Sequence, residues 1–360
     1  MNKSNKVLFF GPYPNPITGQ SISFKEVFDN YQKKKILINT TRYNNKYISN
    51  FYSILISTYY LLTRKIDVIY FTCSRNKVSA IKDFYLIFLA YIFKIRIVNH
   101  LHGADFKTFI NSYNFFRKVA FFLYNKVNTT IVLLPSMKSQ FNQFTKMKIN
   151  VVENCYSSDY MGLDINLNSK KNQILYLSNL MYSKGILVFL SSLDSILETN
   201  QNTKVFIAGK PMADDFMSRD EIWYKFSDKV ALLEDKYPNR IIYLGIVHGK
   251  DKQKLLEESS IFVLPTFYKT EALPISIIEA MKFGNAIITT NHNYLADIVS
   301  SNNGCLIEPN SVEALKNSIL DLLGSVSNLK KIQKHNITES SLKYDSVIFN
   351  KKILNILENK

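Results

Sequence analysis

The stretch from Ile261 to Thr290 reads IFVLPTFYKTEALPISIIEAMKFGNAIITT. It opens with a short apolar run, Ile261–Leu264, which is typical of a strand buried on both faces. After a loop, Pro274 begins a run with helical spacing that ends near Gly284, because proline suits the first turn of a helix and glycine its carboxyl end. A second apolar run, Ala286–Thr289, follows. Strand, helix and strand in this order predict two parallel strands joined by a helix.

The same alternation extends over the rest of the chain. In the first half we expect strands at Lys6–Phe10, Asp67–Phe71, Arg96–His100 and Thr130–Leu134, and helices at Ser21–Tyr31, Ile48–Leu62, Val78–Phe93 and Phe115–Lys126. In the second half we expect further strands at Ile174–Leu177, Lys204–Ala208 and Arg240–Leu244, and helices at Lys184–Glu198, Ser311–Leu323 and residues 344–360. The pattern predicts an α/β protein with doubly wound, Rossmann-like parallel sheets.

Length and a break in the pattern predict two domains. The chain has 360 residues, which suits two domains of ordinary size. The pattern lapses in a polar stretch around residues 151–171, and there we place a hinge. We expect a first domain at 1–160, a second domain at 161–343, and a last helix, 344–360, that packs back on the first domain. Because ligands bind at the carboxyl ends of parallel strands, two facing sheets can hold two substrates against each other.

Composition favours a cytoplasmic protein without a bound metal. The amino terminus lacks the apolar region of a signal peptide. The most apolar stretch, Ile81–Val98, has too short an uninterrupted run for the roughly 20 residues that a bilayer span needs, so we expect a core or interfacial helix there. Three distant cysteines indicate neither a disulfide framework nor a zinc site. Asp214 and Asp215 lie in an expected loop without neighbouring ligands, so no metal residue is assigned.

The net charge of +16 indicates an anionic partner, either an anionic membrane or a phosphorylated substrate. A lysine-rich composition throughout the chain is the alternative explanation. A nucleic acid is not expected, because no recognition module is present. The helices of the first domain combine basic and aromatic residues, including Lys33–Lys35, Arg64–Lys65 and Phe115–Lys118, which suits docking on an anionic membrane. A solvated basic face over an ordinary core is the alternative.

The segment Thr270–Glu279 carries the clearest chemical signal. Glu271 lies in the loop before the expected helix, and Glu279 lies inside it. The free amides of a helix amino terminus bind phosphate, and two flanking carboxylates can each accept hydrogen bonds from sugar hydroxyls. A surface loop followed by a salt-bridged helix glutamate is the alternative interpretation.

The block EALPISIIEAMKFGNAIITTN, residues 271–291, resembles the E-x7-E region of the family-4 retaining glycosyltransferases, which have the GT-B fold. The resemblance extends over nearly the whole chain. Gly19 with Gln20 and Ser21 is similar to the loop after the family's first strand, and His102-Gly103 to its H-G pair. Leu180 with Lys184-Gly185 is similar to its L-x-x-x-K-G signature. The order and spacing of these motifs together are specific.

The resemblance implies that the first domain faces the acceptor and the second binds the nucleotide-sugar donor. It also implies roles for individual residues of the second domain. Glu279 would bind the donor ribose and Glu271 a hydroxyl of the donor sugar. Lys184 would neutralise the diphosphate, and the amides of the helix tip would contact the sugar and the diphosphate. The remaining implied donor-binding positions are Leu273, Ile275, Ser276, Gly209 and Ile246.

Two implied positions belong to the first domain, and one departs from the family pattern. His102 would contact the transferred sugar from the domain opposite Glu271, and Gly19 would leave room for the donor. The family's usual phosphate-binding arginine is Asn179 here, which lacks the fixed fork of donors that arginine offers. One of the two cations that face the diphosphate is therefore missing.

Taken together, the resemblance implies a retaining, metal-independent hexosyltransferase. The donor would be a nucleotide sugar, with UDP-sugar favoured and GDP-mannose as the alternative, and no cofactor is expected. The acceptor would be a lipid-linked or free saccharide in the synthesis of capsule, O-antigen or lipopolysaccharide, at the inner face of the cell membrane. Two other functions stay open: a non-catalytic nucleotide-sugar-binding partner of another glycosyltransferase, which Asn179 favours, and a nucleotide-sugar epimerase of the same fold. A dinucleotide oxidoreductase fits less well, since no G-x-G-x-x-G follows an expected strand.

Overall fold

The computed structural model describes residues 6–112 and 114–358. The chain divides into two compact units, which are described separately here. Unit 1 contains the residues up to Cys155 and those from Ser346 onward, and unit 2 contains Tyr156–Asp345. The first division thus falls between Cys155 and Tyr156, inside the polar stretch where the hinge is expected but before residue 160.

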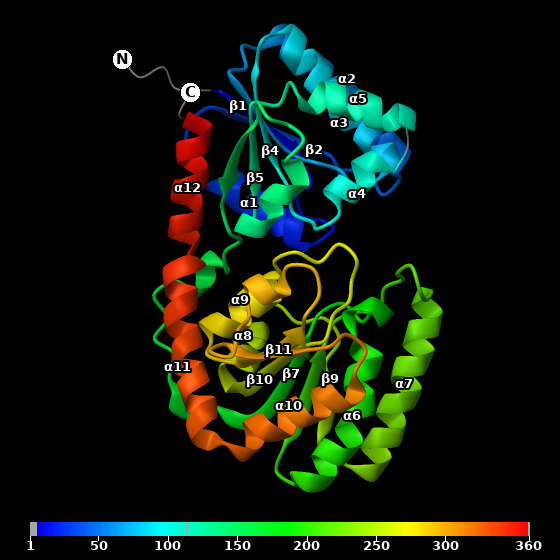
Figure 1. Ribbon diagram of the computed structural model, residues 1–360, viewed down its shortest axis with the longest axis vertical. Coiled ribbons are helices and arrows are strands. Elements are labelled where there is room, and N and C mark those ends of the chain that lie inside the picture. The colour runs from blue at the N-terminus through cyan, green and yellow to red at the C-terminus, as the bar shows by residue number, and fades with distance from the viewer. Residues whose placement is uncertain (1–5, 113, 359–360) are drawn as a thin grey trace. The chain divides into compact units, whose positions relative to one another are not determined.

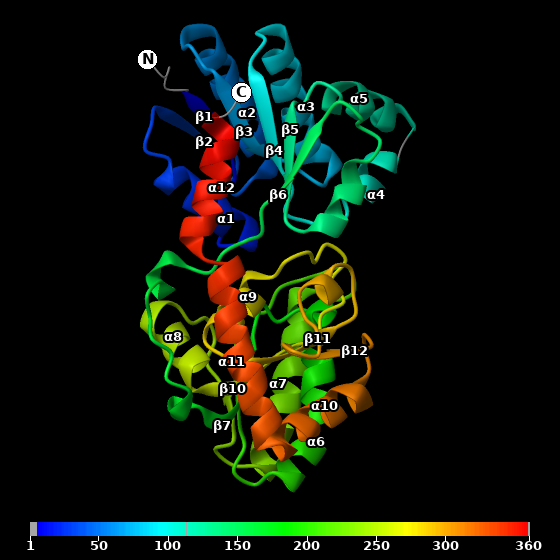
Figure 2. The same ribbon diagram turned by 60° about the vertical axis from the view of Figure 1, so that its left-hand side comes forward.

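Unit 1 is built on a parallel sheet of strand order β2-β1-β3-β4-β5-β6 (Figures 1 and 2, with all six strands labelled in Figure 2). The strands are β1 (Val7–Gly11), β2 (Lys35–Asn39), β3 (Val68–Thr72), β4 (Arg96–His100), β5 (Thr129–Val132) and β6 (Lys148–Val151). The helices are α1 (Gly19–Asn30), α2 (Lys46–Thr63), α3 (Lys77–Ile92), α4 (Phe106–Asn111), α5 (Asn114–Tyr124) and α12 (Ser346–Glu358). The chain starts in the interior strand β1, adds β2 on one side and then winds outward on the other side through β3 to β6, as a doubly wound sheet does.

The last helix completes the core of unit 1. Phe349, Ile353 and Leu357 of α12 are buried in one cluster with Val7 and Phe9 of β1. The Arg96 guanidinium also donates hydrogen bonds to the carbonyls of Ile356 and Leu357, which lie at the carboxyl end of α12. Helices α1 and α12 share one face of the sheet, and α2, α3 and α5 cover the other (Figures 1 and 2).

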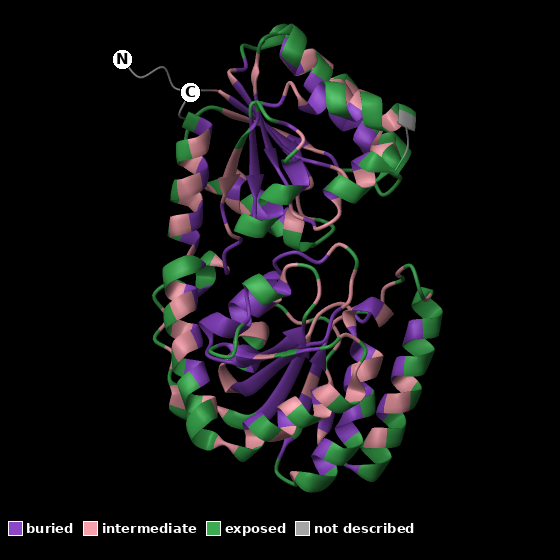
Figure 3. Ribbon diagram, in the orientation of Figure 1, coloured by how far each residue is buried: buried purple, intermediate pink, exposed green. Residues whose placement is uncertain are grey.

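Unit 2 repeats this architecture with the strand order β12-β11-β10-β7-β8-β9, all parallel. Its strands are β7 (Lys171–Leu177), β8 (Lys204–Ala208), β9 (Ile241–Tyr243), β10 (Ser259–Leu264), β11 (Ala286–Thr290) and β12 (Gly304–Ile307). Its helices are α6 (Ile186–Thr199), α7 (Arg219–Lys236), α8 (Gly249–Glu258), α9 (Ile275–Lys282), α10 (Val312–Gly324) and α11 (Val326–Lys343). The inner strands of both units are largely buried, and most helices are buried along one side only (Figure 3).

Two strands of unit 1, β2 and β6, were not predicted. The basic run Lys33–Lys35, which was placed among the helices, instead leads into the edge strand β2. Both missed strands lie at the edges of the sheet, where a strand is exposed enough to carry lysine and asparagine and loses the continuous apolar pattern. Among the helices of the described ranges, none combines the length and apolar character that crossing a bilayer requires.

Candidate functional site

Two loops of unit 2 meet at the carboxyl ends of β7 and β10, which are neighbours in the sheet. The first loop leads from β7 into a 3₁₀ turn, Tyr182–Lys184, and the second follows β10. The Phe267 amide donates a hydrogen bond of 2.7 Å to the Ser183 carbonyl, and the Thr266 hydroxyl donates one of 3.3 Å to the same oxygen. These bonds hold the two loops together, so residues far apart in sequence form one site.

Lys184 and Glu271, one from each loop, form an ion pair. Their side chains are only 13% and 9% exposed. The Thr266 hydroxyl donates a second hydrogen bond to Glu271 Oε2 at 3.2 Å, and Lys184 Nζ lies 5.0 Å from the centroid of the Tyr268 ring. The Lys184 charge is therefore held by a carboxylate and an aromatic face within a largely desolvated site, where an electrostatic interaction is stronger than in water.

Gly185 allows this close approach of the two loops. Its φ of +76° is a backbone conformation that favours glycine, and a Cβ atom at this position would lie 2.1 Å from the Pro265 carbonyl oxygen. Gly185 is also the residue that precedes the first turn of α6. Any side chain here would push apart the two loops that carry Lys184 and Glu271.

The tip of α9 follows directly after Glu271. The helix runs from Ile275 to Lys282 with Pro274 as its N-cap, so it starts one residue later than the predicted Pro274 and ends two residues before Gly284. Leu273 and Ile275 are buried and Ser276 is half-buried. The first amides of a helix have no partner within the helix, and the helix dipole adds positive potential at this end. This end of α9 is suited to an anion.

Glu279 lies in the middle of α9 and is buried. Its carboxylate is paired with Lys252 of α8, whose Nζ lies 2.6 Å from Oε2. Burial raises the pKa of this carboxyl, and the charge of Lys252 opposes that change. The pair fixes the position of a buried carboxylate inside α9.

The remaining predicted positions of unit 2 lie around the ends of β7, β8 and β9. A Cβ atom on Gly209 would lie 1.8 Å from the Ser178 carbonyl oxygen, so close packing between the two strand ends already requires glycine here. Asn179, the next residue, accepts a hydrogen bond of 3.3 Å from the Tyr176 hydroxyl through its carbonyl. Ile246 is exposed just beyond β9. Asn179 thus lies in the loop that carries Lys184 and Gly209 packs against that loop, whereas Ile246 follows β9, which β8 separates from β7.

Gly19 and His102 belong to unit 1. Gly19 is the exposed first residue of α1, behind the N-cap Thr18, whose hydroxyl accepts a hydrogen bond from the Ser21 amide at 3.1 Å. His102 lies just beyond β4. Its ring centroid is 4.0 Å from that of His100, and the Tyr70 hydroxyl lies 2.6 Å from His100 Nδ1.

His102 is a neutral imidazole. Burial of the ring and the nearby positive charge of Arg75 lower its pKa to about 3. Both ring nitrogens are shielded from solvent and have no hydrogen-bond partner among the described residues. Arg75 itself packs where a Cβ atom on Gly103 would lie, and it pairs with Asp105 at 2.7 Å. Leaving both nitrogens of this ring without a partner costs free energy.

The site of unit 2 lies in a segment that matches a known protein family. Residues 164–338 match the family "Glycosyl transferases group 1". This segment is a group 1 glycosyl transferase domain. The group 1 domain lies within unit 2 and contains Lys184, Glu271, Glu279 and Lys252.

A curated relative is also named as a glycosyltransferase. An uncharacterized glycosyltransferase of Methanocaldococcus jannaschii is 25% identical over 152 residues, which are 42% of this chain and 35% of that protein. The chain thus matches about a third of the length of this relative.

Solved structures are similar to the whole chain in fold. Anabaena HepE in complex with UDP has a TM-score of 0.73 at 15% identity and covers 99% of this chain and 100% of its own. A glycosyltransferase from Rickettsia africae reaches 0.72 at 18% identity, and sucrose-phosphate synthase from Thermosynechococcus elongatus reaches 0.70 at 12%, each covering 98% of both chains. The predicted fold of two Rossmann-like parallel-sheet domains of the GT-B type is confirmed.

Some residues of these sites were not predicted from the sequence. Lys252, Thr266 and Tyr268 of the group 1 domain contact the predicted glutamates and Lys184, and Arg75 of unit 1 sets the charge beside His102. Thr266 and Tyr268 lie close enough to Glu271 in sequence to be guessed, whereas Lys252 and Arg75 carry no local signal. Within the described residues, no group of three or more histidine, cysteine or acidic side chains is arranged to hold a metal ion.

Proposed function

We propose that this chain is a retaining, metal-independent hexosyltransferase that moves a sugar from a nucleotide donor to a saccharide or lipid-linked acceptor. The observation that carries the proposal is the Lys184–Glu271 ion pair beside the tip of α9, inside a group 1 glycosyl transferase domain. A lysine, helix-tip amides and a carboxylate in one place match the needs of an activated sugar: two groups for the diphosphate and one for a sugar hydroxyl.

The chemistry assigned to these groups is charge stabilisation of the leaving group. As the bond between the anomeric carbon and the diphosphate breaks, negative charge accumulates on the diphosphate oxygens. Lys184 and the α9 amides interact more strongly with that charge than with the intact donor, which lowers the barrier. In this proposal the acceptor hydroxyl attacks the anomeric carbon from the face that the diphosphate leaves. Its proton passes to the leaving phosphate, and the anomeric configuration is retained.

The nucleotide and the acceptor are the finer part of the proposal. UDP-sugars are favoured, because HepE is seen with UDP and with UDP-glucose, and GDP-mannose is the alternative donor. His102 and Gly19 of unit 1 are assigned to the transferred sugar. We place the reaction in cell-surface polysaccharide synthesis, such as capsule, O-antigen or lipopolysaccharide, at the inner face of the cell membrane.

Two other functions make different predictions for the same assay. A non-catalytic partner of another glycosyltransferase would bind the nucleotide sugar without releasing nucleoside diphosphate, and Asn179, which replaces the arginine expected from the family pattern, favours it. A nucleotide-sugar epimerase would change the donor sugar without consuming an acceptor. Mass spectrometry of a panel of nucleotide sugars, incubated with lipid-linked and free saccharides, distinguishes all three outcomes.

The test of the site uses the ion pair itself. Lys184→Met and Glu271→Gln should each lower the transfer rate by at least roughly 100-fold, because each removes a charged group that contacts the reacting sugar or its diphosphate. Each single variant should also lower the melting temperature, since it leaves one largely buried charge unpaired. The double variant should regain stability and remain inactive.

The matched control is Lys171→Met, which breaks the more exposed Lys171–Glu258 pair of the same unit, where the two charges lie 2.7 Å apart. It should leave both the rate and the melting temperature nearly unchanged. Transfer at the wild-type rate by either single variant would contradict the proposed roles of Lys184 and Glu271.

A further inference from the structure

Helix α2 of unit 1 has its apolar side facing outward. Its buried positions are Ser49, Ser53, Ser57 and Leu61, which recur every four residues. The opposite side is an exposed stripe of large apolar residues, Tyr47, Ile48, Phe51, Leu55, Tyr59 and Leu62. A surface helix of a soluble protein normally shows the reverse arrangement.

The buried serines explain how α2 remains packed without its apolar side. The Ser49 hydroxyl donates to the Thr40 carbonyl at 2.8 Å, and the Ser53 hydroxyl to the Ser49 carbonyl at 2.7 Å. Small, satisfied side chains let α2 approach the sheet and α3 closely. The apolar stripe is therefore not needed for the core of unit 1, and its exposure requires another explanation.

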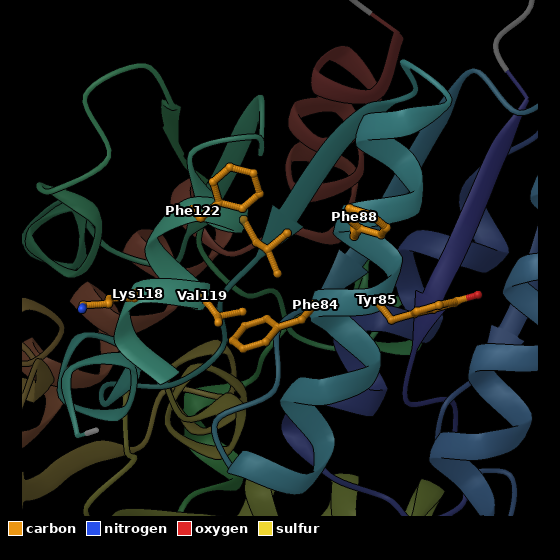
Figure 4. Close-up of a pocket in the computed structure, with 7 residues that line it drawn as sticks. Phe84, Tyr85, Phe88, Lys118, Val119 and Phe122 are labelled. Atoms are coloured by element: carbon orange, nitrogen blue, oxygen red, sulfur yellow. The ribbon is translucent and has the colours of Figure 1, made fainter. Parts of the chain in front are cut away.

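The neighbouring helices extend the apolar surface. Phe84, Tyr85 and Phe88 of α3 and Val119 and Phe122 of α5 line a groove of about 480 Å³ between the two helices (Figure 4). Outside the groove, Phe115 and Phe121 of α5 and Tyr91 and Ile92 of α3 are also exposed. We call the outer sides of these three helices the α2–α3–α5 face.

The charges on this face have one sign. Helices α2 and α5 contain no acidic residue, and the single acidic residue of α3, Asp83, is buried in an ion pair with Lys82 at 2.9 Å. Exposed cations surround the apolar residues: Arg64 and Lys65 after α2, and Arg117 and Lys118 on α5. Lys126 lies 4.4 Å from the Tyr91 ring centroid and 5.0 Å from that of Phe122, which places a cation among the exposed aromatic rings.

Apolar side chains set among cations, with no exposed carboxylate on the three helices, match the boundary between acyl chains and anionic headgroups. We propose that the α2–α3–α5 face docks this protein on an anionic lipid bilayer, with the α2 stripe in the acyl boundary and the cations on the headgroups. Docking would bring the protein to a lipid-linked acceptor in the same bilayer, and this consequence rests on the proposed function. Binding to the bilayer itself requires neither donor nor acceptor.

Vesicle co-sedimentation of the full chain tests this surface. We expect binding to vesicles of phosphatidylcholine with phosphatidylglycerol, and much weaker binding to phosphatidylcholine alone. The triple variant Phe51→Ser/Leu55→Ser/Leu62→Ser should lower the partition coefficient at least roughly tenfold, because it removes the apolar stripe. Arg117→Ser/Lys118→Ser should lower the partition coefficient on anionic vesicles by roughly fivefold for each cation removed. Added salt should also lower the partition coefficient on anionic vesicles, because it screens the charges.

The matched control is Leu232→Ser/Val326→Ser/Leu342→Ser, which removes three equally exposed apolar residues from unit 2. It should bind anionic vesicles like the unchanged protein. Both triple variants should have the melting temperature of the unchanged protein. Equal binding by the α2 variant and the control would overturn the proposal. So would a dimer in light scattering that the α2 variant dissociates, without vesicle binding, because the face would then hold a second copy.

The proposed reaction is measured separately in the same samples. Hydrolysis of the nucleotide sugar, or transfer to a soluble saccharide, should be the same for the α2 variant and the unchanged protein. Vesicle binding without turnover would count against the proposed function and leave the docking surface in place. Turnover without vesicle binding would support the proposed function and overturn the docking surface.

Discussion

The histidines at the end of β4 show how a neutral ring is set up within unit 1. His100 lies inside the strand and His102 two residues later, with their ring centroids 4.0 Å apart. Burial lowers the pKa of both groups, and the charge of Arg75 adds to the effect on His102, whose pKa falls to about 3. The positive charge that one imidazole would gain on protonation further disfavours protonation of the other.

This pair predicts a pH dependence of stability. Because the folded pKa of His102 lies below the ordinary value of about 6.5, the unfolded chain binds protons that the folded chain does not. The free energy of unfolding should therefore fall as the pH drops from about 6.5 toward 3, by up to about 1.4 kcal/mol per pH unit for each histidine. His102→Gln should make this slope shallower in urea unfolding, and the exposed His248→Gln should not. An unchanged slope for His102→Gln would contradict a buried neutral ring.

At the scale of elements, the site of unit 2 depends on two loops at neighbouring strand ends. Gly185 allows contact between the turn Tyr182–Lys184 and the loop after β10, because a Cβ atom would lie 2.1 Å from the Pro265 carbonyl oxygen. The Phe267–Ser183 hydrogen bond joins the same loops. The position of Lys184 relative to Glu271 is thus a property of the packed loops and not of either loop alone.

Gly185→Ala tests this arrangement. It should cost about 1–3 kcal/mol of stability, since alanine is strained at a φ of +76° and its Cβ atom would displace Pro265. It should also weaken UDP binding, measured by calorimetric titration, because the ion pair would be displaced. Gly324→Ala is the control: it ends helix α10 with open space around a Cβ atom, and should be neutral or stabilising by about 0.5–1 kcal/mol. Unchanged UDP affinity in Gly185→Ala would contradict the role of the loop contact.

At the scale of the whole molecule, the chain returns to unit 1 after completing unit 2. Helix α12 buries Ile353 and Leu357 against strands from the beginning of the sequence. Unit 1 is therefore completed only by α12, whereas unit 2 is one continuous segment.

Ile353→Ala tests how much α12 contributes to the stability of unit 1. It should lower the free energy of unfolding of unit 1 by about 2–5 kcal/mol, because the side chain is fully buried and its loss leaves a cavity. Val347→Ala on the exposed side of the same helix should change it by less than about 0.5 kcal/mol. The two variants can be compared by urea unfolding followed by limited proteolysis. Equal stability of the two would show that α12 is dispensable for unit 1.

The alternation of apolar runs and helical segments determined the fold class, because a strand buried on both faces needs a continuous apolar run wherever it occurs. The Glu271–Glu279 block and Lys184-Gly185 were recognisable for a similar reason: a loop, a proline and a helix start impose local spacing. The edge strands β2 and β6 lacked the apolar run and were missed.

Only the tertiary structure decided the contacts made between segments. It paired Lys184 with Glu271 and Glu279 with Lys252, and it put Arg75 beside His102. It also decided that α2 buries serines and exposes phenylalanine and leucine, although its sequence reads as an apolar helix of ordinary kind. Periodicity fixes which residues share a face of a helix, but the neighbouring sheet and helices choose which face is buried. Side-chain pairing across loops depends on strand order, which no local pattern encodes.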